Sequence, residues 1–360
     1  MSSDTAQGQD RVLASGRRLG WMDTVRGTAI LLLLLWHANA VPQFFGTPMP
    51  DIVNSANAFF FPYRMPTLML LSGMLLARSL KKPLPVYYAG KLAMVLWPYL
   101  IWVIIAKIVF LEQPGVPWWH WHAWYATSYL WFLFFIGVYY AAAPLLKRLP
   151  PWAPIALGAA AGVLLEQGSM EQRMGYFAVF FFAGSWIASS PGLIDKLARP
   201  RAAILLGIPA LAFGAASIIW TESLHYSVWG APLSIAGALA LVAVFARPHV
   251  DGPVAQGLQF LGRSSIVFYV SHFPIMAMLS RSLLAEGSFL LLASLNLAAA
   301  ILLGGLLAMY KSTRPVAWLF RAPHWITGAT RSAIGFVTTR FESPAQRDRA
   351  PGEQLPQVSE

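Results

Sequence analysis

The chain has 360 residues, of which 57% are hydrophobic and only 11% are charged, and it contains 15 tryptophans and no cysteine. Soluble domains carry about 25% charged residues, whereas several apolar stretches here reach the roughly 18 to 20 residues that cross a bilayer core. The net charge of +11 does not indicate nucleic-acid binding, because the cations fall at the ends of apolar runs. The lack of cysteine excludes disulfides and thiol catalysis. We therefore predict an all-α, polytopic membrane protein with about ten transmembrane helices in one bundle.

The apolar stretches predict the following order of segments. Residues 1–18 are polar and are expected to form a disordered cytoplasmic tail without a removable signal peptide. Residues 19–311 would form one transmembrane domain, with spans at 24–41, 56–78, 86–110, 128–146, 152–166, 174–190, 202–220, 227–246, 264–284 and 288–310. Residues 312–341 keep aromatic residues among arginines, which suits an interfacial or cytoplasmic segment. Residues 342–360 are expected to form a second disordered tail.

The charges between the spans predict the orientation of the bundle. One side receives nearly all of the lysines and arginines, whereas the other side receives only two basic residues, Arg173 and Arg281. Acidic residues such as Glu112 and Glu286 fall on that second side. Connections rich in Lys and Arg remain in the cytoplasm. Both termini are therefore expected to be cytoplasmic.

The first span carries ionisable groups at both ends of its apolar run. Asp23 and Arg26 open the run and His37 closes it, with no charged residue between Arg26 and His37. At about 100° and about 1.5 Å per residue, eleven steps place Arg26 and His37 within about 20° of one face and about 16 Å apart. Ionisable groups inside a membrane default to a functional hypothesis. The alternatives are that Arg26 is an interfacial anchor and that His37 only bonds a neighbouring helix.

The ninth span carries a second polar stripe. Ser265, Tyr269 and His272 are spaced by four and three residues, so they share one helical face. His272 lies nine residues past Arg263, and both histidine-bearing spans run outward, so His37 and His272 are expected at similar depth. Such a stripe must face protein or a water-filled cavity. A purely structural hydrogen-bonded helix contact remains the alternative.

The second span contains Arg64 between Pro62 and Pro66, and it ends near the pair Ser72-Gly73. The prolines free backbone groups that must be satisfied inside the protein. The small pair either permits close helix packing or leaves the backbone accessible to a ligand. Arg64 is a candidate substrate-binding residue.

The connection at residues 112–127 is rich in aromatic residues, among them Trp118, Trp121 and Tyr125. It is either an aromatic belt at the membrane surface or a stacking surface for a sugar. His120 and His122 lack a third ligand, so we predict no metal site.

The residue types indicate a chemistry. A histidine at mid-membrane suits general-base catalysis, because its pKa lies near working pH. A helix-borne arginine near the cytoplasm suits phosphate or pyrophosphate. No Walker sequence, dinucleotide fingerprint or nucleophile-elbow motif is present. An acyl carrier bearing phosphates would dock from the cytoplasm, its acyl end would reach His37, and an alcohol would meet it from the far side.

In these segments the sequence resembles the acyltransferase-3 family of integral membrane O-acyltransferases. The matching pieces are Asp23, Arg26-Gly27 and His37, FPYRMPTLMLLSG with Ser72-Gly73, YLWFL at 129–133 with Trp131, and LGRSSIVFYVSH at 261–272. The resemblance covers about residues 20–310. It implies transfer of an acyl group, often acetyl, from acyl-CoA to a hydroxyl of a sugar, glycan or lipid at the outer face of the bacterial cytoplasmic (inner) membrane.

By that resemblance, His37 would be the catalytic base and Arg26 would contact acyl-CoA. We expect His272 to assist His37, Lys91, Arg78, Ser72 and Gly73 to help bind the donor, and Asp23, Arg64, Trp131, Ser265 and Tyr269 to line the substrate path. Many members carry two arginines before the proline of the third span, whereas this chain has only Lys91 before Pro98.

Two rival functions remain. The chain could be a transporter or flippase for a lipid-linked sugar, although no internal duplication is visible. It could also be a structural partner in an envelope-synthesis complex, for which His37 would be dispensable. The sequence does not indicate the acceptor, the acyl chain length or the oligomeric state.

Overall fold

The computed structural model describes residues 20–109, 117–190, 192–197, 199–246, 252–283 and 288–341. Its elements in chain order are α2 (Gly20–Phe44), α3 (Asp51–Met74), α4 (Leu76–Ser79), α5 (Leu84–Lys91), the π-helix η1 (Leu92–Leu96), α6 (Trp97–Val109), the 3-10 turns η2 (Trp121–Trp124) and η3 (Ser128–Leu130), α7 (Trp131–Leu146), α8 (Ala153–Leu164), α9 (Met170–Ser189), α10 (Leu193–Leu197), α11 (Pro200–Ile219), α12 (Thr221–Leu224), the 3-10 turn η4 (Val228–Gly230), α13 (Ala231–Phe245), α14 (Pro253–Arg263), α15 (Ser265–Leu283), α16 (Phe289–Tyr310), α17 (Val316–Phe320) and α18 (His324–Phe341).

The predicted all-α, polytopic membrane architecture is confirmed, since the described residues are helical without a strand. Seven helical stretches are long and apolar enough to cross a membrane: Gly20–Phe44, Asp51–Ser79, Leu84–Val109, Ser128–Leu146, Pro200–Ile219, Val228–Phe245 and Phe289–Tyr310. Each of the other three predicted spans is also a helix, but α8 has only 12 residues and α9 and α15 are not among the seven. The count of ten spans therefore stays a prediction. The two tails, Glu112 and Glu286 lie outside the described residues.

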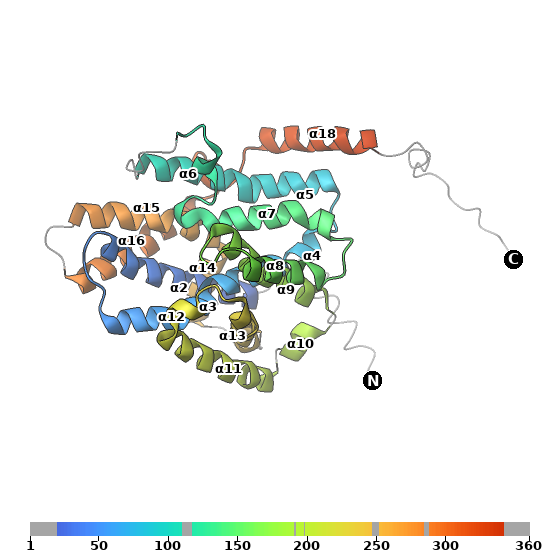
Figure 1. Ribbon diagram of the computed structural model, residues 1–360. Helices are drawn as coiled ribbons and strands as arrows, with labels where there is room; N and C mark the ends of the chain where they lie inside the picture. Colours follow the sequence, from blue (N-terminus) through green and yellow to red (C-terminus); the bar gives the residue numbers. More distant parts are fainter. Residues whose placement is uncertain are drawn as a thin grey trace.

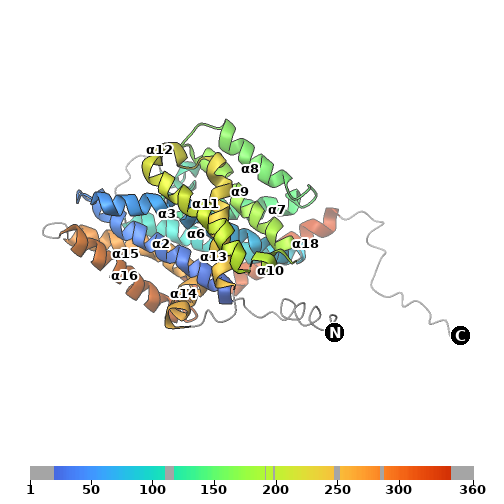
Figure 2. The same ribbon diagram turned by 90° about the horizontal axis from the view of Figure 1, so that it is seen from below.

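The long helices run roughly alongside one another in a single bundle (Figures 1 and 2). Helix α2 is central and contacts α3, α13, α14, α15 and α16. Aromatic side chains of α7 and α9, including Phe135, Phe177 and Phe181, are completely buried in the largest core cluster. Because α2 is surrounded by other helices, its polar residues can face protein. Ionisable side chains inside a membrane almost always do so, since contact with lipid is costly.

Glycines bring two helix pairs into direct backbone contact. A Cβ atom on Gly27 of α2 would lie 1.8 Å from the carbonyl oxygen of Leu258 on α14, and one on Gly262 would lie 1.9 Å from that of Asp23. Between α3 and α9, a Cβ atom on Gly73 would lie 1.7 Å from the carbonyl oxygen of Phe181. Only glycine permits such approaches. The first turn of α2 is therefore held by α14, an eleven-residue helix that the apolar spans alone did not predict.

The chain after α16 is attached to the flank of the bundle, where α18 lies beside α5 (Figure 1). In the π-helix η1, the partner of the Ala93 carbonyl would be the nitrogen of Pro98, which carries no hydrogen. The N–H of Ala322 donates to that carbonyl instead, at 3.0 Å. Trp97 and Trp102 add indole hydrogen bonds to the carbonyls of Trp318 and Leu319. Whether residues 312–341 are interfacial stays a prediction, but their first part is fixed to α6.

Candidate active site

Two histidines from different helices meet inside the bundle. His37 of α2 and His272 of α15 have ring centroids 4.7 Å apart, with an interplanar angle of 63°. Phe273 packs edge-on against His37 at 5.6 Å, and Trp36 flanks it at 6.5 Å. The two polar stripes that the sequence placed at similar depth therefore come into contact at these rings.

Both imidazoles present the same nitrogen to their own helix. Nδ1 of His37 lies 3.1 Å from the carbonyl oxygen of Leu33, and Nδ1 of His272 lies 3.0 Å from that of Phe268. A carbonyl oxygen can only accept, so each Nδ1 carries the proton and donates it. In the neutral rings each Nε2 is then left with a lone pair. Nε2 of His272 is buried without a hydrogen-bond partner.

Exposure distinguishes the two rings. His272 is 0% exposed, whereas His37 keeps a partly exposed surface. His37 is therefore the more accessible of the two rings. The roles predicted for His37 and His272 stay predictions, and the difference in exposure is the observation that separates the two rings.

A reciprocal pair of tyrosines fixes the helix that carries His272. The hydroxyl of Tyr269 donates to the carbonyl of Tyr129, and the hydroxyl of Tyr129 donates to the carbonyl of Val270 at 2.8 Å. The Tyr129 ring also stacks on Phe273 at 4.9 Å. Tyr269 is 3% exposed and joins α15 to the Tyr129 backbone, whereas Ser265, one helical turn before it, is only partly buried. Their predicted contact with the substrate stays a prediction.

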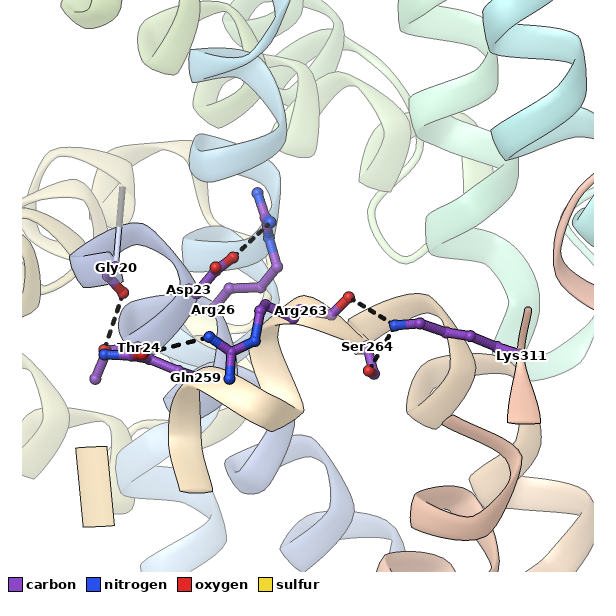
Figure 3. A network of polar contacts seen from close by, with 8 residues as sticks. All are labelled: Gly20, Asp23, Thr24, Arg26, Gln259, Arg263, Ser264 and Lys311. Atoms are coloured by element: carbon purple, nitrogen blue, oxygen red, sulfur yellow. Dashed lines mark hydrogen bonds and ion pairs between the residues drawn. The ribbon is translucent and has the colours of Figure 1, made fainter. Parts of the chain in front are cut away.

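A polar cluster lies at the other end of α2, which we call the Arg26 end (Figure 3). Arg26 pairs with Asp23 at 3.9 Å, and Asp23 is 3% exposed. Lys311, at the end of α16, donates to the carbonyl of Arg263 at 3.3 Å and to Oγ of Ser264 at 2.8 Å. These bonds join the ends of α14, α15 and α16 beside the first turn of α2. Asp23 therefore orients Arg26.

Lys91 approaches the same region from α5. Its Nζ lies 3.4 Å from the ring centroid of Tyr140 and 3.2 Å from Oγ of Ser79. The hydroxyl of Tyr140 donates to the carbonyl of Ser72 at 3.0 Å and lies within electrostatic range of Arg26. Tyr140 thus links Lys91, Ser72 and Arg26 into one polar region.

The other two residues predicted to bind the donor differ in their surroundings. Arg78 is exposed, so it is free to meet a ligand from solution. Gly73 is buried against the backbone of Phe181, which is the close helix packing that the sequence left as the alternative. Close packing of α3 on α9 therefore accounts for Gly73, and its contact with the donor stays a prediction.

Packed apolar residues separate the Arg26 end from the histidine pair. Ile30, Leu33 and Leu34, on the stretch of α2 between them, are each at most 4% exposed. A cavity of about 360 Å³ lies between α5, α7 and α18, and its mostly apolar lining also contains Lys91. A second cavity, of about 20 Å³, lies beside Arg64. Neither of these two cavities is lined by His37. Neither cavity therefore joins the Arg26 end to His37.

Beyond His37, the bundle holds arginines among aromatic rings. Arg64 of α3 is 5% exposed, and its guanidinium carbon lies 4.7 Å from the Trp36 ring centroid. Trp131, a predicted substrate-binding residue, is covered by Arg173 at 5.0 Å. Both predicted residues, Arg64 and Trp131, thus belong to arginine–aromatic contacts.

Two groups at this end, Glu171 in the first turn of α9 and His225 after α12, have shifted pKa values. The pKa of Glu171 is lowered by a 2.7 Å hydrogen bond from the Tyr125 hydroxyl. Burial lowers the pKa of His225, and Glu222 opposes that shift. His120 and His122 approach each other at 3.1 Å between Nδ1 atoms. Within the described ranges no three metal-ligating side chains cluster.

Several residues of the site were missed by sequence reasoning. The helical periods of α2 and α15 predicted His37 and His272, whereas Tyr140, Tyr226 and the indole of Trp36 carry no such pattern. Arg173 gave one signal, because it is one of only two basic residues predicted on its side of the membrane.

The sequence and the structure were compared with known families and proteins. A family model described as an acyltransferase domain matches residues 19–310, which is most of the chain. No curated protein and no solved structure matches.

Proposed function

Since the chain belongs to the acyltransferase-3 family, and is a membrane acyltransferase, we propose that it transfers an acyl group from cytoplasmic acyl-CoA to an envelope acceptor. The acyl group would be acetyl or another short chain, and the acceptor a hydroxyl of a sugar, glycan or glycolipid. The observation that carries the proposal is the contact of His37 and His272, in which both Nε2 atoms keep a lone pair. A neutral imidazole with a free Nε2 is suited to accept a proton at neutral pH.

The proposed reaction proceeds at His37. Its Nε2 removes the proton from the acceptor hydroxyl while that oxygen forms a bond to the thioester carbonyl carbon. The carbon–sulfur bond then breaks, and the proton on His37 passes to the departing CoA thiolate. His272 supports the His37 ring from the buried side, and Tyr269 and Ser265 belong to the helix face that holds it.

The donor phosphates would bind at the Arg26 end. Arg26 is held by Asp23. Lys91 lies over the ring of Tyr140, whose hydroxyl donates to the carbonyl of Ser72. Arg78, six residues after Ser72 in the sequence, is exposed. Cationic side chains recognise phosphate oxygens through charge-assisted hydrogen bonds. Lys91 takes the place of the arginine pair that many members carry, and it offers one point charge instead of two forked guanidinium groups.

The cellular placement follows from the charge pattern. We infer a bacterial cytoplasmic membrane, with the Arg26 end and both termini in the cytoplasm, because lysines and arginines concentrate on that side. The donor then arrives from the cytoplasm and the acceptor from the opposite side. The bilayer and the two substrates are the partners that this requires.

Mass spectrometry of envelope glycans and lipids tests the proposal. Cells expressing the protein should show an added acyl mass on one class of molecule, and cells expressing His37→Ala at equal membrane level should lack it. His324→Ala, which changes an exposed histidine of α18, is the matched control and should keep the modification. Export of an unmodified lipid-linked sugar with no consumption of acyl-CoA would instead support a transporter.

A further inference from the structure

Arg64 and Arg173 have no acidic partner in the described part of the chain. Arg64 is 5% exposed, and Arg173 is partly buried with an Nε atom that has no hydrogen-bond partner. Among the residues that the structure describes, no carboxylate lies within pairing distance of Arg64 or Arg173. A buried charge without a counter-charge is costly, so some other group must offset it.

Aromatic rings offset part of that cost, but Nε of Arg173 stays without a hydrogen-bond partner. The guanidinium carbon of Arg64 lies 4.7 Å from the Trp36 ring centroid and 5.7 Å from that of Phe61. That of Arg173 lies 5.0 Å from Trp131 and 4.6 Å from Tyr226. Cation–π contacts use the faces of a guanidinium. Its five N–H donors point outward in the plane, in the fork geometry that matches carboxylate and phosphate.

Tyr226 brings the two arginines to one place. It covers Arg173, and it also lines the small cavity whose wall contains Arg64, Phe61 and Tyr176. Its backbone has a φ of 52°, a conformation that is strained for a tyrosine and is found mainly where surrounding structure imposes it. The cavity has room for about one water molecule. It therefore suits a single oxyanion group at its mouth and not a whole sugar.

This cavity lies next to the proposed reaction centre. Trp36, which stacks on Arg64, is the chain neighbour of His37, and Arg64 lies within electrostatic range of the His37 ring. Arg64 and Arg173 also lie away from the Arg26 end, where the donor phosphates are proposed to bind. An anion held here would belong to the second substrate.

We propose that Arg64, Arg173 and Tyr226 bind an anionic group, a carboxylate or a phosphate, carried by the acyl acceptor beside the hydroxyl that is acylated. This inference rests on the proposed function and adds the charge of the substrate. The same guanidinium and hydroxyl donors would bind the carboxylate of an acidic sugar or a phosphate. The phosphate would belong to a lipid-linked sugar or to a lipid headgroup.

A binding experiment tests the inference without requiring turnover. Purified His37→Ala protein is titrated with sodium glucuronate, sodium phosphate or glucose at constant ionic strength, and thermal unfolding is followed. A ligand of the folded state raises the melting temperature in a saturable way. We expect saturation with one of the two anions and none with glucose; glucuronate would identify the carboxylate source and phosphate the phosphate source. A lack of saturable stabilisation by either anion would overturn the inference.

Arginine variants locate the binding. Arg64→Gln and Arg173→Gln should each weaken the anion about tenfold or more, the loss expected for charge-assisted hydrogen bonds. Arg201→Gln, at an exposed arginine of α11, is the control and should bind as before. If Arg64→Gln does not fold, Arg64→Lys keeps the charge without the fork and should still bind more weakly. Unchanged binding in the folded Arg64 and Arg173 variants contradicts the inference.

Turnover separates this inference from the proposed function. Transfer is measured in proteoliposomes with acetyl-CoA and the protein that keeps His37. This protein should prefer an alkyl glucuronide, or phosphatidylglycerol, to an uncharged alkyl glucoside. Arg173→Gln should lose that preference. Equal loss for charged and uncharged acceptors would overturn the inference, because the arginines would then serve the reaction centre itself. Anion binding at Arg64 and Arg173 without any transfer would support the anion site but contradict the proposed function, and with it the assignment of the anion to an acyl acceptor.

Discussion

His272 differs from His37 in what can reach it, and that difference gives a prediction. Replacing His37 by Gly should open a space that free imidazole can enter from the substrate side, so added imidazole should restore part of the lost transfer. His272→Gly should also lower the rate, but imidazole should not restore it, because His272 is 0% exposed. The measurement is acyl transfer in proteoliposomes as a function of imidazole concentration.

Rescue of both variants to the same extent would show that the two rings are equally accessible, against the assignment of His272 as a positioning residue. Tyr269→Phe is a useful companion, since it removes only the hydroxyl that donates to Tyr129. It should lower the rate without creating a space for imidazole.

The contact of α2 with α14 is the element on which the Arg26 end depends. In Gly27→Ala the new Cβ atom would lie 1.8 Å from the Leu258 carbonyl oxygen, so α14 must shift. We expect overpacking to cost about 1–3 kcal/mol. The gain of about 1 kcal/mol for alanine over glycine within a helix offsets part of it, so the net loss should reach about 2 kcal/mol when α14 cannot relax. Thermal unfolding in detergent measures the change.

Gly257→Ala, on α14 itself, is the matched control. Nothing lies within 4 Å of a Cβ atom at Gly257, so only the helix propensity changes and the protein should be unchanged or slightly more stable. Equal effects of the two substitutions would contradict the close approach of α2 and α14. Gly27→Ala should also raise the KM for acyl-CoA, because α14 holds the turn that carries Asp23 and Arg26.

At the scale of the whole molecule, the orientation can be measured directly because the chain has no cysteine. Single cysteines at two exposed positions, Lys82→Cys and Trp119→Cys, report the two sides. We expect a membrane-impermeant maleimide to label Trp119→Cys in intact cells and Lys82→Cys only after permeabilisation. The reverse pattern would place the Arg26 end outside the cell and leave cytoplasmic acyl-CoA without access to it.

Periodicity explains how much the sequence could predict. The long apolar runs predicted the helices, and steps of eleven and nine residues from Arg26 and Arg263 placed the two histidines at one depth. Contacts between distant segments carry no such period. Three such contacts join residues far apart in the chain: the hydrogen bonds from Ala322 to Ala93 and from Tyr129 to Val270, and the cation–π contact of Arg173 with Trp131. They depend on which helices become neighbours, which local sequence does not encode.

The central claim is that the imidazole of His37 is the base that drives acyl transfer from acyl-CoA. Purified protein and His37→Ala, both folded and reconstituted with acceptor lipid, should be compared for loss of the acyl-CoA thioester and gain of acylated acceptor. We predict that His37→Ala lowers the rate about 10²- to 10⁴-fold, the usual contribution of general-base catalysis. Equal rates of acceptor acylation in the two proteins would contradict the account.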